Sequence, residues 1–339
     1  MSRAGLNRKT AYATLAMTLA AEAPDIDMFW GVRGPVAALQ HHRGITHTLV
    51  AAPAMALLAT GAVWLWHRTF GHRKPHNDPP IRWGWIWFLA LLADFSHLLL
   101  DWTNNYGVRP FFPFNTHWYA GSFVFIFDPV LFGLLLLALV APAIFGLADR
   151  EMGLRRPRFR GQGWALFALC GMLIWWSWRW AEHRVAITTI ANQPITDEPA
   201  TRIFASPRPL DPWLWDVVVE TRDFYQLARI NLRTDTVQTH TPEDVFYKPP
   251  VTPAIRAAEG SWLGRVYLDW SMLPLVESVG GFGAQPGGGQ YTRVRFRDMR
   301  FFSTLPILRG QHRATLSGVV TVAPNGQIDE MEFAGREQQ

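Results

Sequence analysis

Apolar residues are concentrated in the first half of the chain, where they form long runs with few charges. Four of these runs approach or reach the ~20 residues that a helix needs to cross a bilayer. A fifth run, Thr10–Ala23, is shorter, and we expect it to be retained and to insert only partway. Tryptophans near the run ends are typical of a membrane–water interface. The pattern predicts a multi-pass helical membrane domain over residues 1–182, with long runs at Leu49–Trp66, Trp83–Leu100, Phe123–Leu147 and Trp164–Trp180.

Residues 183–339 show a different pattern, in which apolar and polar positions alternate. Arg293, Arg295 and Arg297 alternate with Val294 and Phe296, which is the period of a half-buried strand. Similar stretches are LWDVVVET (214–221), YQLARINLRT (225–234), GRVYLDWSML (264–273) and ATLSGVVTVA (314–323). PNGQ (324–327) predicts a hairpin turn, TPAIRAAEGS (252–261) a short helix, and GGFGAQPGGGQ (280–290) a flexible loop. The predicted fold class is therefore a mainly α-helical multi-pass membrane domain followed by a small β-rich extramembrane domain.

The distribution of positive charge predicts the orientation in the membrane. The formal net charge is +5, and the stretches 67–82 and 149–163 carry four and five Lys/Arg residues. Cationic loops stay in the cytoplasm, so we expect the part after residue 183 to lie in the periplasm of a bacterium, with the helices in the inner membrane. No dense basic stripe with interleaved aromatic residues is present, which argues against nucleic-acid binding. Cys170 is the single cysteine, so a metal site would have to use His, Asp and Glu.

Three polar clusters interrupt the apolar half of the chain. PDID (24–27) contains two aspartates, and HHRGITH (41–47) contains three histidines and an arginine. In ADFSHLLLDWTNNYG (93–107), Asp94, His97 and Asp101 are spaced i, i+3 and i+7, which places them on one face of a helix. Asn105 would extend this stripe if the helix continued. The predicted topology places all three clusters on the outer side of the membrane.

The residue types in these clusters indicate a divalent metal site. Imidazole and carboxylate groups suit zinc, and manganese is an alternative. The predicted ligands are Asp25, Asp27, His42, His47, His97 and Asp101.

Other polar residues near these clusters have simpler alternatives beside a catalytic role. Asp94 is a candidate base, or a carboxylate that orients a ligand histidine. Arg43 and Arg109 can hold an anionic group, because guanidinium matches phosphate in a bidentate manner. Arg43 can instead pair with Asp25 or Asp27. Either of these aspartates can simply cap a helix, and Thr46 can cap a helix that begins at His47.

The motifs PDID, HRGITHT (42–48), DFSHLLLDWTNNYGVRPFFPF (94–114) and FDP (127–129) resemble the YdjM/YbcI-type family of inner-membrane proteins, often described as metal-dependent hydrolases. The resemblance covers roughly residues 5–147. It implies a distant similarity to zinc-dependent phospholipase C and P1-type nucleases, whose helical His-x-x-x-Asp pair looks like His97 and Asp101. An aspartate of PDID and a histidine of HRGITH would complete the site. Family members usually begin with a Thr-His pair, whereas this chain begins MSRAGLNRKT, so we expect either a missing ligand or a start downstream of the family's usual one.

These observations lead to two functional hypotheses. The first is a membrane-bound metal-dependent hydrolase that acts on an ester or phosphodiester bond of a small-molecule or lipid-like substrate at the outer membrane face. The alternative is a non-catalytic envelope assembly or stress factor, with a structural metal and a partner-binding β domain. A transporter is less favoured, because we find no inverted repeat with paired broken helices. In each case the lipid bilayer is a partner.

Overall fold

A computed structural model gives the fold of most of the chain. It describes residues 1–71, 79–152, 161–193, 195–239, 243–284, 290–302 and 316–338. The cationic stretches 67–82 and 149–163 therefore lie partly outside the described residues. The chain divides into two compact units. The first comprises Met1–Ile26, Arg43–His183 and Pro207–Pro212, and the second comprises Asp27–His42, Arg184–Ser206 and Trp213–Gln339.

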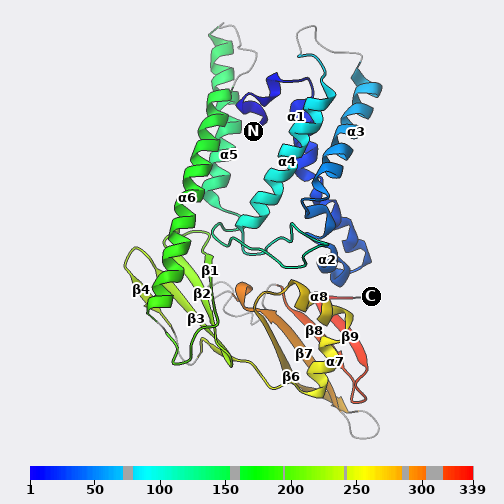
Figure 1. Ribbon diagram of the computed structural model, residues 1–339, viewed down its shortest axis with the longest axis vertical. Helices are drawn as coiled ribbons and strands as arrows, with labels where there is room; N and C mark the ends of the chain where they lie inside the picture. Colours follow the sequence, from blue (N-terminus) through cyan, green and yellow to red (C-terminus); the bar gives the residue numbers. More distant parts are fainter. Residues whose placement is uncertain are drawn as a thin grey trace. The chain divides into compact units, whose positions relative to one another are not determined.

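Three helices of the first unit pack through small side chains. They are α1 (Ala13–Glu22), α3 (Ala52–Phe70) and α4 (Trp83–Thr103), and α4 contacts both of the others (Figure 1). Alanine at a helix contact allows the two backbones to approach closely, which favours packing between membrane helices. Short 3-10 turns, η1 (Ser2–Ala4) and η2 (Leu6–Arg8), precede α1. The buried residues at this contact are Ala13, Met17, Ala20, Ala56, Ala59, Leu89, Ala90 and Ala93.

Two longer helices form an antiparallel pair, α5 (Pro129–Glu151) and α6 (Gln162–Asn192). Phe145 stacks on Trp164 with ring centroids 5.9 Å apart, and Trp175 Nε1 donates to Asp128 Oδ2 at 3.1 Å. The prediction of one continuous run from Phe123 was wrong in its first part, because α5 begins only at Pro129. Asp128 Oδ1 accepts hydrogen bonds from the backbone N–H groups of Val130 and Leu131, which is the role of an N-cap residue. Pro129 follows it, and proline suits the first position of a helix.

Two described helices are long and apolar enough to cross a membrane, α4 and the part Pro129–Leu147 of α5. A third span is added if the segments Pro35–His47 and Ala52–Phe70 together form one. Helix α1 has 10 residues and rises only about 15 Å, half of the ~30 Å hydrocarbon core. The helical N-terminal region with candidate membrane spans is therefore confirmed, and the full multi-pass topology stays a prediction.

Within its described residues, the second unit contains two five-stranded sheets. In the first sheet the order is β1-β2-β3-β4, and β5 also pairs with β3; in the second the order is β10-β9-β8-β7-β6. Both sheets contribute buried residues to one core, with Val218 and Tyr225 from the first and Leu275 from the second. The strands are β1 (Arg202–Pro207), β2 (Leu214–Glu220), β3 (Phe224–Asn231), β4 (Thr236–Gln238), β5 (Val245–Tyr247), β6 (Pro274–Ala284), β7 (Gln290–Asp298), β8 (Gly318–Val322), β9 (Ile328–Phe333) and β10 (Arg336–Glu337).

The structure corrects two predictions in this unit. Residues 264–273 were predicted as a strand, but helix α8 (Trp262–Trp270) occupies most of this stretch. Ser261 Oγ caps the helix by accepting from Gly264 N at 3.0 Å, and the buried residues recur with helical spacing. The predicted loop 280–290 is also shorter, because β6 continues to Ala284 and β7 begins at Gln290; residues 285–289 lie outside the described part.

Two other predictions for this unit are confirmed. The short helix is α7 (Pro253–Glu259), in which Thr252 accepts a hydrogen bond from Ile255 N. The PNGQ turn joins β8 to β9 in an antiparallel hairpin. The β-rich character of the C-terminal region is thus established by local pattern and by strand pairing together.

Glu220, at the end of β2, accepts hydrogen bonds from the side chains of three residues. Lys248 Nζ lies 2.9 Å and the Tyr225 hydroxyl 3.2 Å from Oε1, while Arg202 Nη2 lies 2.8 Å from Oε2. Burial alone would raise the pKa of Glu220. The hydrogen bonds and charges of Lys248 and Arg202 outweigh burial and hold this pKa below its ordinary value.

Candidate metal centre

Three segments of the first unit bring polar side chains together at one end of α4. His97 and Asp101 lie one turn apart on α4, as their spacing predicts. His47 ends the 3-10 turn η4 (Ile45–His47), and Asp25 lies in the 3-10 segment η3 (Pro24–Arg33). Helix α4 ends at Thr103, and Asn104 is extended, so Asn105 does not continue the helical stripe.

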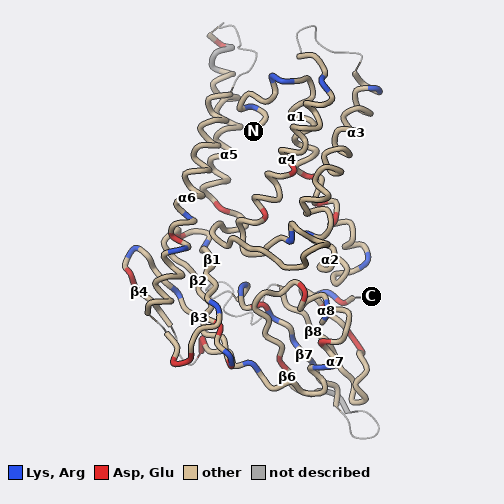
Figure 2. Tube along the Cα trace, viewed as in Figure 1, with Lys and Arg blue, Asp and Glu red and all other residues tan. Residues whose placement is uncertain are grey.

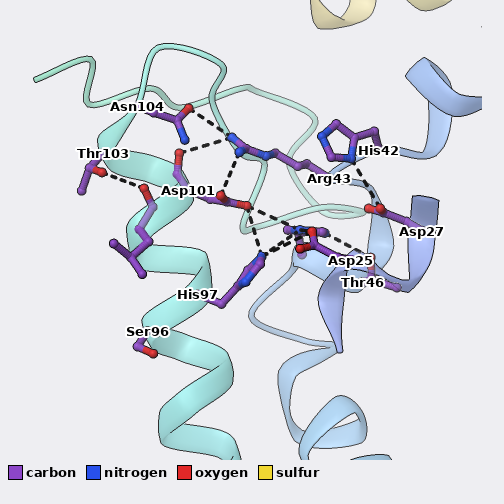
Figure 3. Close-up of polar contacts among 12 residues, drawn as sticks. Asp25, Asp27, His42, Arg43, Thr46, Ser96, His97, Asp101, Thr103 and Asn104 are labelled. Atoms are coloured by element: carbon purple, nitrogen blue, oxygen red, sulfur yellow. Dashed lines mark hydrogen bonds and ion pairs between the residues drawn. The ribbon is translucent and has the colours of Figure 1, made fainter. Parts of the chain in front are cut away.

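The side chains of Asp25, His97 and Asp101 point toward one another (Figure 3). The Nε2 atoms of His47 and His97 are 3.2 Å apart. Asp25 Oδ1 lies 3.4 Å from His47 Nε2 and 3.7 Å from His97 Nε2. Asp101 Oδ2 lies 3.4 Å from Nε2 of both histidines. Asp25, His47 and His97 thus form a group that can hold a metal ion, and Asp101 lies against it.

These distances are close to those between the ligands of one zinc ion. Ligand atoms that lie ~2.0–2.1 Å from a tetrahedral zinc ion are roughly 3.3–3.4 Å from each other. The five distances given above are 3.2–3.7 Å, and the ligand atoms of Asp25, His47 and His97 all lie within 4.8 Å of one another. The four donors, two imidazole nitrogens and two carboxylate oxygens, are also the atom types that zinc and manganese bind. The residues present therefore fit a divalent metal ion.

The burial of the group adds a second observation. Asp101 Oδ2 is buried and faces Nε2 of both histidines at 3.4 Å. A buried carboxylate is unfavourable unless a charge or hydrogen bonds compensate it, and a cation at the centre of the group would do so. The Asp25 side chain is 36% exposed, whereas His47 is fully buried, so the group is open on the side of Asp25.

Thr46 holds His47 in the orientation that points Nε2 at the group. Its Oγ1 lies 3.2 Å from Nδ1 of His47, within hydrogen-bond distance. Such a contact to one ring nitrogen fixes the ring and leaves the other nitrogen for the metal. Thr46 was predicted to cap the following helix, and this was wrong: Thr48 Oγ1 accepts from Ala51 N at 3.1 Å, and α3 begins at Ala52.

Arg43 holds the other carboxylate oxygen of Asp101. Its Nη2 donates to Asp101 Oδ1 at 2.8 Å, and Nη1 donates to Asn104 Oδ1 at 3.2 Å and to the Gly107 carbonyl at 3.0 Å. The guanidinium lies over the Tyr106 ring, 4.8 Å from its centroid. Arg43 is buried and has a positive φ of 51°. These contacts turn Asp101 so that Oδ2 faces the histidines, which makes Arg43 a positioning residue here.

The remaining candidate residues lie in other environments. Asp27 is buried, and its Oδ1 lies 3.4 Å from Nδ1 of His42, so these two residues pair with each other in the second unit. Asp94 is fully buried, and neither of its oxygens has a hydrogen-bond partner among the described residues. Arg109 is buried beside the rings of Phe112 and Trp118, 4.7 and 4.8 Å from their centroids.

Sequence reasoning missed two residues that shape the group. One is Asn104, and the other is Thr46, whose contact with His47 was not predicted. Asn104 Oδ1 accepts from Tyr106 N at 2.9 Å as well as from Arg43. The NNYG stretch could have indicated this turn, since asparagine often hydrogen-bonds to the backbone two residues further on. The contact of Thr46 had no comparable signal.

The family comparison covers the part of the chain that carries the metal group. The model of the YdjM inner membrane protein family matches residues 1–186, which is more than half of the chain. The chain belongs to this family. A YdjM family protein with two candidate membrane helices is a membrane protein, so the predicted family and the membrane character are both confirmed.

A comparison with one relative and with the solved structures gives less information about this chain than the family model does. The uncharacterized protein YfhP of Bacillus subtilis (strain 168) is 28% identical over 129 residues, which is 38% of this chain. The match spans only 36% of the length of that relative. No solved structure matches the chain significantly. The similarity to phospholipase C and P1-type nucleases therefore stays a prediction.

Proposed function

We propose that this YdjM family protein is a membrane-bound, metal-dependent hydrolase that cleaves an ester or phosphodiester bond of a lipid-like substrate at the outer membrane face. The observation that carries the proposal is the group of ligand atoms from Asp25, His47 and His97, with Asp101 Oδ2 3.4 Å from both histidines. Zinc is the preferred ion, with manganese as the alternative. The cationic loops support a multi-pass arrangement in the inner membrane with a periplasmic C-terminal region.

Each residue has a defined task in this proposal. The four donors hold the ion, which when bound supplies Lewis acidity toward a carbonyl or phosphoryl oxygen. Arg43 fixes Asp101, and Thr46 fixes His47. Asp94 lies one turn before His97 on α4 and interacts electrostatically with it, which makes it the candidate for proton transfer or for orienting that histidine. A substrate would enter on the exposed side of Asp25.

A structural metal is the second candidate, because four protein donors are available. Structural zinc sites are closed by four protein ligands, whereas catalytic sites keep one position for water or substrate. If Asp101 Oδ2 is a permanent ligand, the ion would tie η3, η4 and α4 together without a reaction. The β-rich unit would then be the working part of an envelope factor and would bind a partner.

The two functions can be separated with the purified full-length protein. Metal content and hydrolysis of ester and phosphodiester lipids are measured for the wild type, for the double variant His97→Ala/Asp101→Ala and for His117→Ala, an exposed histidine of the first unit that serves as a matched control. The hydrolase proposal predicts metal and activity in the wild type and the control, and neither in the double variant. Metal without any hydrolysis favours the structural role. Equal and negligible metal in all three proteins excludes both functions.

A further inference from the structure

The η4 segment and the loops next to the end of α4 that carries the metal group expose a set of large apolar side chains. We call this set the apolar rim. Residues 44–51 and 104–127 contain a single Asp, Glu, Lys or Arg, the buried Arg109, and Figure 2 draws the loop that follows α4 almost entirely in tan. Phe114 is 84% exposed and Ile45 64%. The rim consists of Ile45, Leu49, Val50, Phe111, Phe114, Ile126 and Phe127.

Hydrogen bonds join these loops into one surface at the end of α4. Leu49 N donates to the Pro110 carbonyl at 2.9 Å, which ties the η4 segment to the loop after α4. Gly121 N donates to Trp102 O at 2.6 Å, and Phe123 N donates to Thr103 O at 3.1 Å. The segment before α5 is thereby attached to the last turn of α4. The rim therefore lies at the same end of α4 that carries His97 and Asp101.

The backbone of these loops is also extensively hydrogen-bonded within the protein. Val108 and Tyr119 exchange two backbone hydrogen bonds of 2.9 and 2.7 Å, and Phe114 N donates to Phe111 O at 3.0 Å. Arg43 donates to the carbonyls of Asp101 and Gly107. Non-helical chain is tolerated at membrane depth only where the protein satisfies its polar backbone groups. These hydrogen bonds satisfy a part of the polar backbone groups of the loop within the protein.

Exposed apolar side chains also occur on the two candidate spans where they adjoin these loops in the chain. Leu99 and Leu100 in the last turns of α4 are exposed, as are Val130 and Phe132 in the first turn of α5. Exposed apolar patches of this kind on a protein in water usually mark an interaction site. We propose that the apolar rim is embedded in the lipid leaflet at this end of α4, so that the metal group lies at or below the level of the lipid head groups.

This position specifies how a substrate would reach the group. In combination with the proposed function, on which this step rests, the scissile ester or phosphodiester belongs to an amphiphile that moves in sideways from the leaflet. A soluble ester would first have to partition into the bilayer. The embedding itself depends neither on metal nor on hydrolysis, so it can be tested separately.

Nitroxide labels on the full-length protein in liposomes test the embedding. Cys170 is the single cysteine, and a Cys170→Ser background allows one label at a time. The test labels are Phe114→Cys and Ile126→Cys. The lipid reference is Leu139→Cys, 56% exposed on α5, and the water reference is Tyr247→Cys, 71% exposed on β5. Collision rates with oxygen, which concentrates in lipid, and with a water-soluble nickel chelate are compared.

We expect labels 114 and 126 to resemble label 139, with an oxygen-to-nickel ratio several-fold above that of label 247. A ratio like that of label 247 would overturn the proposal, because the rim would then lie in water. Protection from both reagents would overturn it as well, since another protein surface, such as a second copy of the chain, would then cover the rim. Repeating the measurement without metal separates this outcome from any failure of the hydrolase proposal.

Discussion

Removal of the His97 imidazole tests the metal centre most directly. Nε2 of His97 takes part in three of the five short donor–donor distances, those to His47, Asp25 and Asp101. His97→Ala leaves only the two distances from His47. Structural zinc is bound with about 10–16 kcal/mol in peptide sites of four ligands, so one ligand contributes roughly 2.5–4 kcal/mol. We therefore expect zinc affinity to fall roughly 10²–10³-fold.

The assay is competition for zinc between the detergent-solubilised protein and a chromophoric chelator. His117→Ala is the control, because it removes an exposed imidazole of the same unit and should leave the affinity unchanged. Thermal unfolding of each variant shows whether the helices still fold. If His97→Ala binds zinc as tightly as the wild type while both proteins are folded, the assignment of His97 as a metal ligand is refuted.

Three further predictions follow from other contacts. Arg43→Lys removes the forked contacts with Asp101 and Asn104 and should weaken zinc binding roughly 10–100-fold in the same competition assay. An unchanged zinc affinity would show that Arg43 does not position Asp101. Asp94→Asn should leave the zinc content unchanged, since Asp94 is outside the donor set. It should lower the rate of lipid hydrolysis, because Asp94 is the candidate for proton transfer. Loss of zinc would instead identify Asp94 as a ligand. Glu220 has a pKa below its ordinary value of 4.5, so its ionised form stabilises the fold above about pH 4.5, and this contribution disappears as the pH falls through the lowered pKa. Glu220→Gln should therefore be less stable than the wild type at pH 7 in chemical denaturation, with a difference that shrinks toward pH 3, and a difference independent of pH would contradict this assignment.

The comparison of prediction with structure separates local from non-local information. The His97–Asp101 pair could be predicted because the period of a helix alone places residues four apart on one face. Residues 264–273 show the limit of this approach. Over this short stretch, the apolar positions are compatible with an alternating strand and with a helix. The Ser261 cap and the packing of α8 against β8 favour the helix.

The sequence alone determined the membrane character, the β-rich C-terminal region and the identity of the polar clusters, because these depend on composition and local periodicity. Only the tertiary structure decided which members of each cluster meet. Asp25 and His47 join His97, whereas Asp27 and His42 pair with each other. Asp25 and Asp27 are two residues apart in a 3-10 segment, where the direction of each side chain depends on packing rather than on spacing. Asp101 contacts Arg43 through one carboxylate oxygen and the two histidines through the other. Arg43 and His47 are distant from Asp101 in sequence, so no local pattern predicts these contacts.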